Sequence, residues 1–181
     1  MRKLTHEQIS RRRLKTEEID VVPRIPLYVL VDNVRSLYNV GSIFRTSDGA
    51  MIRELILTGL TPTPPRKEIE KTALGATRSV PWKYFKDPAD AIDELRKQKI
   101  KICCLEQTDR SVPYYNIRKF DFPLCLVVGN EITGISKNIL TKSDLAIEIP
   151  MHGIKHSLNV AVAYGIAVFE LIRIWRDQTS H

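Results

Sequence analysis

Three polar clusters in the sequence hold residue types that could take part in chemistry. The first contains Asn39, Gly41 and Arg45, and Arg45 follows the glycine by four residues, so the two share one face of a helix. An arginine fork suits a phosphate or a carboxylate, and glycine lets a ligand or another backbone segment approach closely. A solvated arginine beside a helix capped by Asn39 explains the same residues, and for this cluster alone we favour that simpler interpretation.

The second cluster is GNEITG at 129–134, where Gly129 and Gly134 enclose Glu131 directly after an apolar run. Glycines at such positions allow the backbone to lie against a ligand, or they form a tight turn. Taken alone, the turn with an exposed Glu131 is the simpler interpretation.

The third cluster belongs to IPMHGIKHSLNVAVAYGIAVFEL at 149–171, where a loop with Gly153 leads into a long apolar helix. We expect the first turn of this helix to carry Ser157 and Asn159. One of them could cap the helix, but capping does not explain both.

The histidines of this loop invite two other interpretations, which we disfavour. His156 and Ser157 are adjacent, so they do not face each other on a helix, and no GxSxG sequence of a hydrolase is present. His152 and His156 are four residues apart, but no third metal ligand is evident, so we expect no metal site.

The elements that must position these clusters follow from the hydrophobic pattern. Apolar runs alternate with helical patterns, which predicts an α/β fold with a mostly parallel sheet and helices on both faces. Ligands of such sheets bind beyond the carboxyl ends of the strands, and each cluster follows a predicted strand. No P-loop and no GxGxxG follows any strand, which disfavours a Rossmann-type nucleotide site. The predicted strands are 27–32, 54–59, 101–107, 125–130 and 145–150; the predicted helices are 39–50, 87–98 and 157–175, with short ones within 61–79 and 136–143.

Charge and length divide the chain into a basic arm, 1–24, and one domain, 25–181. The arm holds seven Lys/Arg and four Asp/Glu, and the whole chain of 181 residues has a net charge of +7. A basic excess suggests an acidic partner such as nucleic acid, although a merely basic protein fits equally well. Thr5 with Gln8 resembles a capping box, which predicts a short polar helix over about 5–16.

The cysteines and the apolar runs suggest where the protein works. Cys103, Cys104 and Cys125 lie in apolar runs, where we expect them to be buried as thiols, so a reducing cytoplasm fits best. The N-terminus lacks the apolar stretch of a signal peptide, and no run of about 18 apolar residues is present, so we expect no membrane span.

Taken in order, the clusters resemble a known family. N-x-G-x-x-x-R at 39–45 is followed by G-N-E-x-x-G at 129–134, I-P-M-x-G at 149–153 and S-L-N-V-A at 157–161, and LEQT at 105–108 is also similar. This arrangement resembles the SpoU (TrmH) family of RNA ribose methyltransferases, within the SPOUT superfamily, from about 27 to 171. The resemblance implies a C-terminal trefoil knot, a homodimer with its active site near the subunit interface, the cofactor S-adenosyl-L-methionine, and methyl transfer to a ribose 2′-hydroxyl.

The resemblance also implies roles for particular residues. Arg45 acts either as a general base or, as we prefer, as a clamp on phosphate that stabilises a developing alkoxide, since an arginine pKa above about 12 suits a base poorly. Ile149 and Leu158 flank the adenine of the cofactor. Catalytic or substrate-positioning roles fall on Asn39, Arg45, Glu131, Ser157 and Asn159; cofactor binding on Leu105, Glu106, Gly129, Asn130, Gly134, Ile149, Met151, Gly153, Ser157 and Leu158; and RNA binding on Arg11, Arg12, Arg13 and Arg45.

The RNA substrate is less closely specified. Many members of the family carry an extra N-terminal RNA-binding domain, whereas only about 24 residues precede the domain here, so we expect recognition by the arm, the catalytic face, or both. This favours tRNA over rRNA. Two alternatives stay open at this point: a non-catalytic RNA-binding protein of the same fold, and a SPOUT enzyme that methylates a base.

Overall fold

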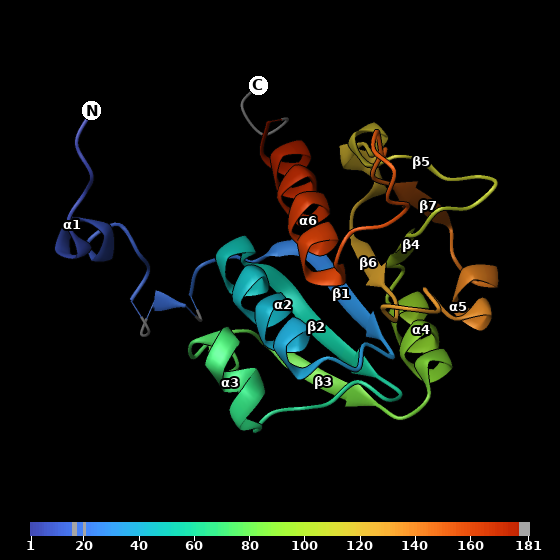
Figure 1. Cartoon of the computed structure of the whole chain (residues 1–181), viewed down its shortest axis with the longest axis horizontal. Coiled ribbons are helices and arrows are strands. Elements are labelled where there is room, and N and C mark those ends of the chain that lie inside the picture. Colours follow the sequence, from blue (N-terminus) through green and yellow to red (C-terminus); the bar gives the residue numbers. More distant parts are fainter. Residues whose placement is uncertain (16–17, 20, 178–181) are drawn as a thin grey trace.

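Seven parallel strands form one sheet in the order β3-β2-β1-β6-β4-β7-β5 (Figure 1). The structure, a computed structural model, describes residues 1–15, 18–19 and 21–177. Its parallel sheet confirms the α/β prediction. The strands are β1 Ile25–Asp32, β2 Ile52–Thr58, β3 Trp82–Phe85, β4 Lys101–Leu105, β5 Val112–Pro113, β6 Leu124–Val128 and β7 Leu145–Glu148.

The centre of the sheet contains the most continuously apolar strands. All five residues of β6 are buried, as are the last four of β1, which is what a parallel strand covered on both faces requires. The order of strands reverses between these two: β2 and β3 continue from β1 on one side, and β4 and β7 continue from β6 on the other. Such a switch point is where open α/β sheets place their ligands.

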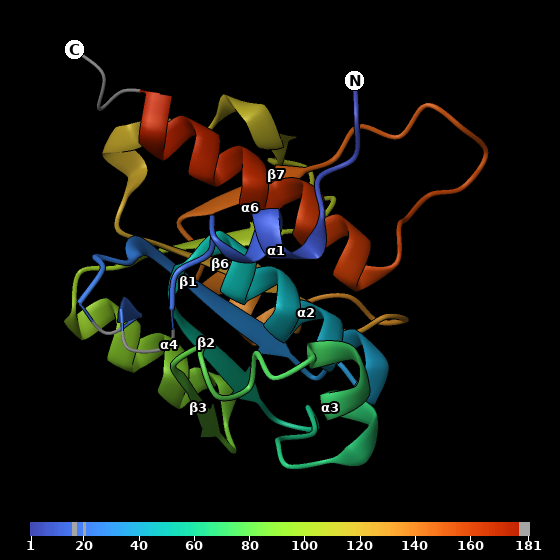
Figure 2. The ribbon, with the colours of Figure 1, turned by 90° about the vertical axis from the view of Figure 1, so that its left-hand side faces the viewer.

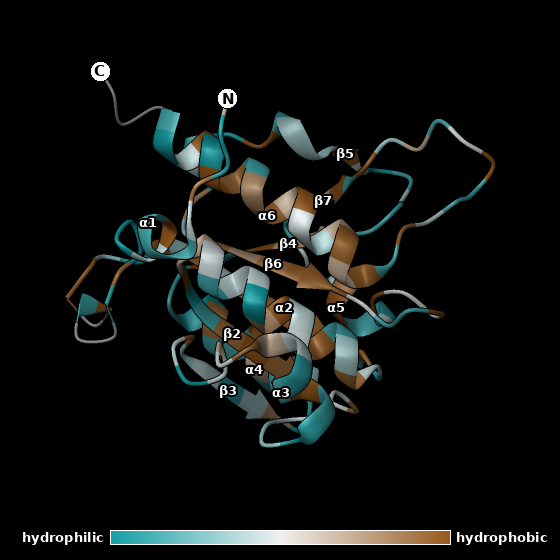
Figure 3. Ribbon diagram, turned by 60° about the vertical axis from the view of Figure 1, so that its left-hand side comes forward, coloured by the Kyte–Doolittle hydropathy of each residue, from teal (hydrophilic) through white to brown (hydrophobic). Residues whose placement is uncertain are grey.

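Helices cover both faces of the sheet, as predicted. Phe44, Ile69 and Tyr164, from α2, α3 and α6, belong to one hydrophobic core; Ile92 and Ile139, from α4 and α5, belong to the other. In Figure 2, α4 lies across the sheet from α2, and Figure 3 shows apolar strands between more polar helices. The helices are α1 His6–Ser10, α2 Leu37–Ala50, α3 Lys67–Ala73, α4 Pro88–Lys97, α5 Lys137–Thr141 and α6 Val160–Asp177, with 3-10 turns at Tyr114–Asn116 and Lys119–Asp121.

A buried polar contact joins α6 to α2. The Ser47 and Tyr164 hydroxyl oxygens lie 2.7 Å apart, and both side chains are fully buried. Burial raises the pKa of Tyr164 despite its hydrogen bond with Ser47. The contact fixes how the C-terminal helix lies on the helix that follows β1, and both helices begin at the carboxyl edge of the sheet.

Several predicted elements differ from those observed. Strands β3 and β5 were not predicted, because the half-buried WKYF and the two-residue β5 lack a strong apolar signal. Helix α1 ends at Ser10 instead of about 16, and α6 begins at Val160 instead of 157, so Ser157 and Asn159 precede the helix.

The cysteines behave as small buried hydrophobes. Cys103, Cys104 and Cys125 are all buried free thiols, as predicted. Burial raises the pKa of each, that of Cys104 to about 12, so the thiolate form is disfavoured. Among the helices of the described residues, none combines the length and apolar character that crossing a membrane requires.

The arm extends away from the body. Helix α1 has no buried residue and lies apart from the other helices in Figure 1. Thr5 caps it in the predicted capping box with Gln8. Arg24 attaches the chain to the body by donating to the carbonyl oxygens of Ile52 (3.2 Å) and Ser79 (2.7 Å).

Candidate active site

The three polar clusters meet at the carboxyl edge of the sheet, next to the switch point. Asn39 Nδ2 donates a hydrogen bond to Glu131 Oε1 (2.9 Å), and Asn159 Nδ2 donates to Asn39 Oδ1 (3.1 Å). Asn39 lies 92 residues before Glu131 and 120 residues before Asn159, so two side-chain hydrogen bonds join three distant segments of the chain. We call Asn39, Glu131 and Asn159 the polar triad.

Asn39 can join the triad because another residue caps its helix. The Ser36 side chain accepts a hydrogen bond from Asn39 N (3.3 Å) at the start of α2, so the expectation that Asn39 is the cap was wrong. The Asn39 amide therefore points across to Glu131 instead of back to its own backbone.

Glu131 lies at the N-terminus of α2 and accepts hydrogen bonds from three donors. Its Oε2 accepts from Arg35 N and its Oε1 from Ser36 N, both at 3.2 Å, in addition to Asn39. Partial burial would raise the pKa of Glu131, but these hydrogen bonds outweigh it and lower the pKa below its ordinary value. The carboxylate is therefore ionised at neutral pH, at a helix end that favours negative charge.

Asn159 is the N-cap of α6. Its Oδ1 accepts from Ala161 N (3.0 Å) and Val162 N (3.4 Å), which satisfies two of the free N–H groups of the first turn. Ser157, by contrast, lies in the exposed loop before the helix. Of the two polar residues Ser157 and Asn159, capping therefore explains only Asn159.

A cavity of about 280 Å³ lies beside the triad, between the ends of β4, β6 and β7 and the start of α6. It is lined by nine of the ten residues expected to bind the cofactor; the exception is Gly153, which is exposed in the loop. Sequence reasoning missed Glu148, although it ends β7 on the edge where a ligand was expected, whereas Gln107 lies in the family-like segment at 105–108. The lining residues are Leu105, Glu106, Gln107, Val128, Gly129, Asn130, Glu131, Ile132, Gly134, Glu148, Ile149, Met151, Ser157, Leu158, Asn159, Val160 and Ala163.

The loop after β6, which carries Glu131, is tightly constrained. A Cβ on Gly129 would lie 2.4 Å from the Gly134 carbonyl carbon, and Gly134 has a φ of +68°, so both positions require glycine. Asn130 Oδ1 accepts from Ile132 N (2.9 Å) and Thr133 N (3.0 Å). The two glycines thus allow the tight turn, and this turn forms one wall of the cavity.

A buried carboxylate that the sequence analysis overlooked ties this loop to β1. Asp32 is fully buried, and its Oδ2 accepts from Ser136 N (2.7 Å) while its Oδ1 accepts from Asn33 Nδ2 (2.7 Å). Asn33 in turn accepts, through its carbonyl oxygen, a bond from Asn130 Nδ2 (2.8 Å). A charged residue at the end of an apolar strand was the signal that could have identified it.

The structure does not bring Arg45 to the triad within one chain. Arg45 is exposed on α2 and makes no hydrogen bond or ion pair within the part of the chain that the structure describes. It lies six residues beyond Asn39, about 9 Å along the helix axis and about 240° around it. Gly41 instead serves packing, since a Cβ there would lie 2.3 Å from the Ile69 carbonyl oxygen of α3.

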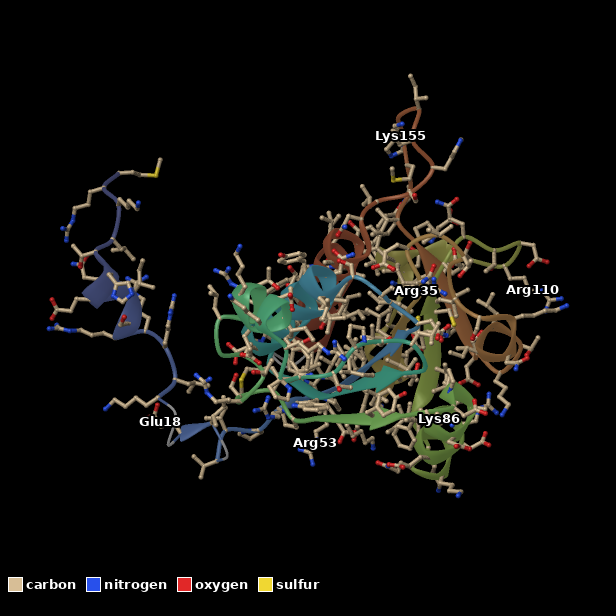
Figure 4. All side chains as sticks on the ribbon, turned by 60° about the horizontal axis from the view of Figure 1, so that its bottom comes forward. Glu18, Arg35, Arg53, Lys86, Arg110 and Lys155 are labelled. Atoms are coloured by element: carbon tan, nitrogen blue, oxygen red, sulfur yellow. The ribbon has the colours of Figure 1, made fainter. Side chains whose placement is uncertain are left out.

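Other cations surround the edge. Arg35 is exposed beside Glu131, and Lys155 lies in the loop that projects from the body before α6 (Figures 2 and 4). His152 and His156 lie exposed in the same loop, where the His156 carbonyl oxygen accepts from Gln107 Nε2 (2.7 Å). Arg11, Arg12 and Arg13 are exposed on the arm; Arg11 pairs with Glu7 (2.6 Å).

Comparison with known proteins identifies the family. Residues 26–169 match the model of the SpoU rRNA Methylase family. A putative TrmH family tRNA/rRNA methyltransferase of Staphylococcus haemolyticus is 31% identical over 80% of this chain and 57% of the relative. The tRNA (guanosine(18)-2′-O)-methyltransferase of Escherichia coli K12 is 31% identical over 81% of this chain and 63% of the relative.

A solved structure agrees with these relatives. The SpoU methyltransferase AviRb of Streptomyces viridochromogenes in complex with AdoMet superposes with a TM-score of 0.78 and 26% identity, over 88% of this chain and 63% of that one. This chain spans about three fifths of the length of the curated relatives named above. The match of the family model to most of the chain, together with the shared fold, shows that the chain belongs to the SpoU (TrmH) family of RNA methyltransferases.

Proposed function

We propose that the protein transfers a methyl group from S-adenosyl-L-methionine to a ribose 2′-hydroxyl of structured RNA. The observation that carries this proposal is the polar triad at the rim of a cavity lined by three loops that match the family. A homologous structure with AdoMet bound and a homologous 2′-O-methyltransferase support it.

The chemistry of the cavity fits the cofactor. Leu105, Ile149 and Leu158 offer apolar surface for the adenine, while the carboxylates of Glu106 and Glu148 give the cavity a negative character that suits a sulfonium and an ammonium group. When bound, S-adenosyl-L-methionine supplies an electrophilic methyl group on a positively charged sulfur. The tight turn at 129–134 has glycine at both ends, so its backbone could lie directly against the cofactor.

The residues of this chain then orient the acceptor. A ribose 2′-hydroxyl is a weak nucleophile, so the site must align it and stabilise charge that develops on its oxygen as its proton is lost to solvent. Amide N–H groups of Asn39 and Asn159 and the hydroxyl of Ser157 suit that task. Arg45 would hold the neighbouring phosphate when RNA lies across α2.

We also propose a homodimer and a C-terminal knot. Val162, Ile166 and Phe169 form an exposed apolar stripe along α6, with 52%, 38% and 51% of their surface exposed, which supports burial against a second subunit. The resemblance to the family supports the knot, and the bond from Gln107 Nε2 to the His156 carbonyl oxygen holds the loops that follow β4 and β7 against each other. Buried free thiols support a cytoplasmic location.

Among RNA classes we propose tRNA, which the name of the E. coli relative supports, with rRNA as the second choice. Incubation of the purified protein with cofactor and each RNA, followed by nuclease digestion and mass analysis, tests this directly. A methyl group retained on the sugar of tRNA is expected. A methyl group on a base would establish base methylation, and RNA binding without methylation would overturn the enzymatic proposal.

Comparing RNA from a deletion strain with RNA from its parent identifies the molecule and the nucleotide. Calorimetry provides a separate readout, in which S-adenosyl-L-methionine is expected to bind while NAD and ATP do not compete. Failure to bind the cofactor even with RNA present would contradict the assignment of the cavity.

A further inference from the structure

The orientation of both triad amides is set from its two ends. At one end Glu131, being ionised, can only accept hydrogen bonds, so Asn39 must turn its Nδ2 toward it (2.9 Å). At the other end Asn159 Oδ1 is engaged by Ala161 N and Val162 N, so Asn159 must offer its Nδ2 to Asn39 Oδ1 (3.1 Å). The two constraints agree, and either amide flipped by itself would set two donors or two acceptors against each other.

Glu131 is poorly suited to take a proton. Its oxygens already accept from Arg35 N, Ser36 N and Asn39 Nδ2, and a general base works best when its pKa lies near the working pH. The hydrogen bonds lower its pKa instead. Its carboxylate therefore holds other groups in place.

We propose that Glu131 is a positioning residue, which orients Asn39 and through it Asn159 so that each amide presents its second N–H to the oxygen that accepts the methyl group. This inference rests on the proposed function. Each Nδ2 has two hydrogens, and the triad engages only one of them. The two remaining N–H groups, held side by side, are the preorganised donors that a developing negative charge on that oxygen requires.

An exchange of acceptor and donor tests the proposal. Glu131→Gln changes one atom and little volume, and its amide oxygen can still accept from Asn39 Nδ2 and Ser36 N. This variant alone should therefore keep the orientation and lose only the bond from Arg35 N. Asn39→Asp sets two carboxylates against each other. In the double variant, the amide at position 131 donates to the carboxylate at position 39, which also accepts from Asn159, so the orientation of Asn159 returns.

Single-turnover rates should therefore be coupled. We expect Asn39→Asp to lose about 10²-fold in rate, as removal of a preorganised donor does, and Glu131→Gln to lose much less, whereas loss of a general base at 131 would abolish most of the rate. The double variant should exceed Asn39→Asp by about tenfold, without full recovery, because position 39 then offers no N–H. If Glu131 were the general base, the double variant would recover nothing. A double variant no faster than the slower single variant overturns the proposal.

A matched control and a second readout separate this idea from the function on which it rests. Glu148→Gln removes another carboxylate that lines the cavity, one whose Oε2 accepts from Ser111 Oγ (2.6 Å), and it should show no coupling to Asn39→Asp. Melting temperatures of the same four proteins measure this coupling without catalysis. Asn39→Asp should lower the melting temperature more when position 131 is glutamate than when it is glutamine. If the unsubstituted protein methylates no RNA, the proposed function fails, and additive melting temperatures would still overturn the orientation.

Discussion

The carboxyl edge of the sheet and the N-terminal arm hold polar residues in opposite ways. At the edge, Asn39, Glu131 and Asn159 are joined by hydrogen bonds of 2.9 and 3.1 Å, and buried Asp32 accepts a hydrogen bond from Ser136 N just beyond the loop of Glu131. On the arm, α1 has five residues, none of them buried, and a helix of that length is marginal without other contacts. A fixed site suits catalysis, whereas an exposed basic segment suits binding. Substitutions at the edge should therefore change turnover, and substitutions on the arm should change RNA affinity.

The largest expected effect is at Arg45. Arg45→Lys keeps the positive charge but loses the planar fork, so turnover should fall by about 10²-fold or more. Cofactor affinity should persist, because Arg45 does not line the cavity. Single-turnover kinetics and calorimetry on the same protein measure both quantities. A rate near that of the unsubstituted protein would remove Arg45 from the catalytic assignment.

Substitutions of Asn159 separate capping from catalysis. Asn159→Asp keeps an acceptor for Ala161 N and Val162 N but has no N–H for Asn39, so we expect near-normal stability with strongly reduced turnover. Asn159→Ala should lose turnover and also about 1 kcal/mol of stability. Thermal melting and single-turnover rates compare the two. Equal turnover in Asn159→Asp and the unsubstituted protein would show that Asn159 is only a cap.

The arm should act through affinity alone. Replacing Arg11, Arg12 and Arg13 by Ala should weaken RNA binding and flatten its salt dependence, by up to about one unit of log–log slope per lost phosphate contact. Cofactor affinity should stay unchanged. A matched variant that removes three exposed cations from the body, at Lys86, Lys97 and Lys99, controls for net charge. An unchanged salt slope in the arm variant would place the arm outside the RNA interface.

The smallest expected effect is the acid dependence of the edge. The pKa of Glu131 in the folded protein lies below its ordinary value of 4.5, so its contribution to stability is present above that pH and is lost as pH falls through the lower folded value. The difference in unfolding free energy between the unsubstituted protein and Glu131→Gln should therefore shrink in acid. Urea unfolding between pH 3 and 7 measures it. A difference that grows in acid would contradict the direction of the pKa shift.

The sequence by itself determined the elements whose signals are local. Apolar runs identified β1, β2, β4, β6 and β7, and Asp87 followed by Pro88 predicted the start of α4, which the structure confirms. The family-like segments also identified eleven of the residues that line the cavity, nine named for cofactor binding together with Glu131 and Asn159.

Only the tertiary structure decided which polar residues meet. No local signal distinguished Ser36 from Asn39 as the cap of α2. Asn39 bonds Glu131 only because β1 and β6 are neighbours in the sheet, although about 95 residues separate their ends. The same placement leaves Arg45 away from the triad within one chain. Local periodicity specifies which face of an element is apolar, but strand order decides which ends of those elements come together, and at this edge those ends form the site.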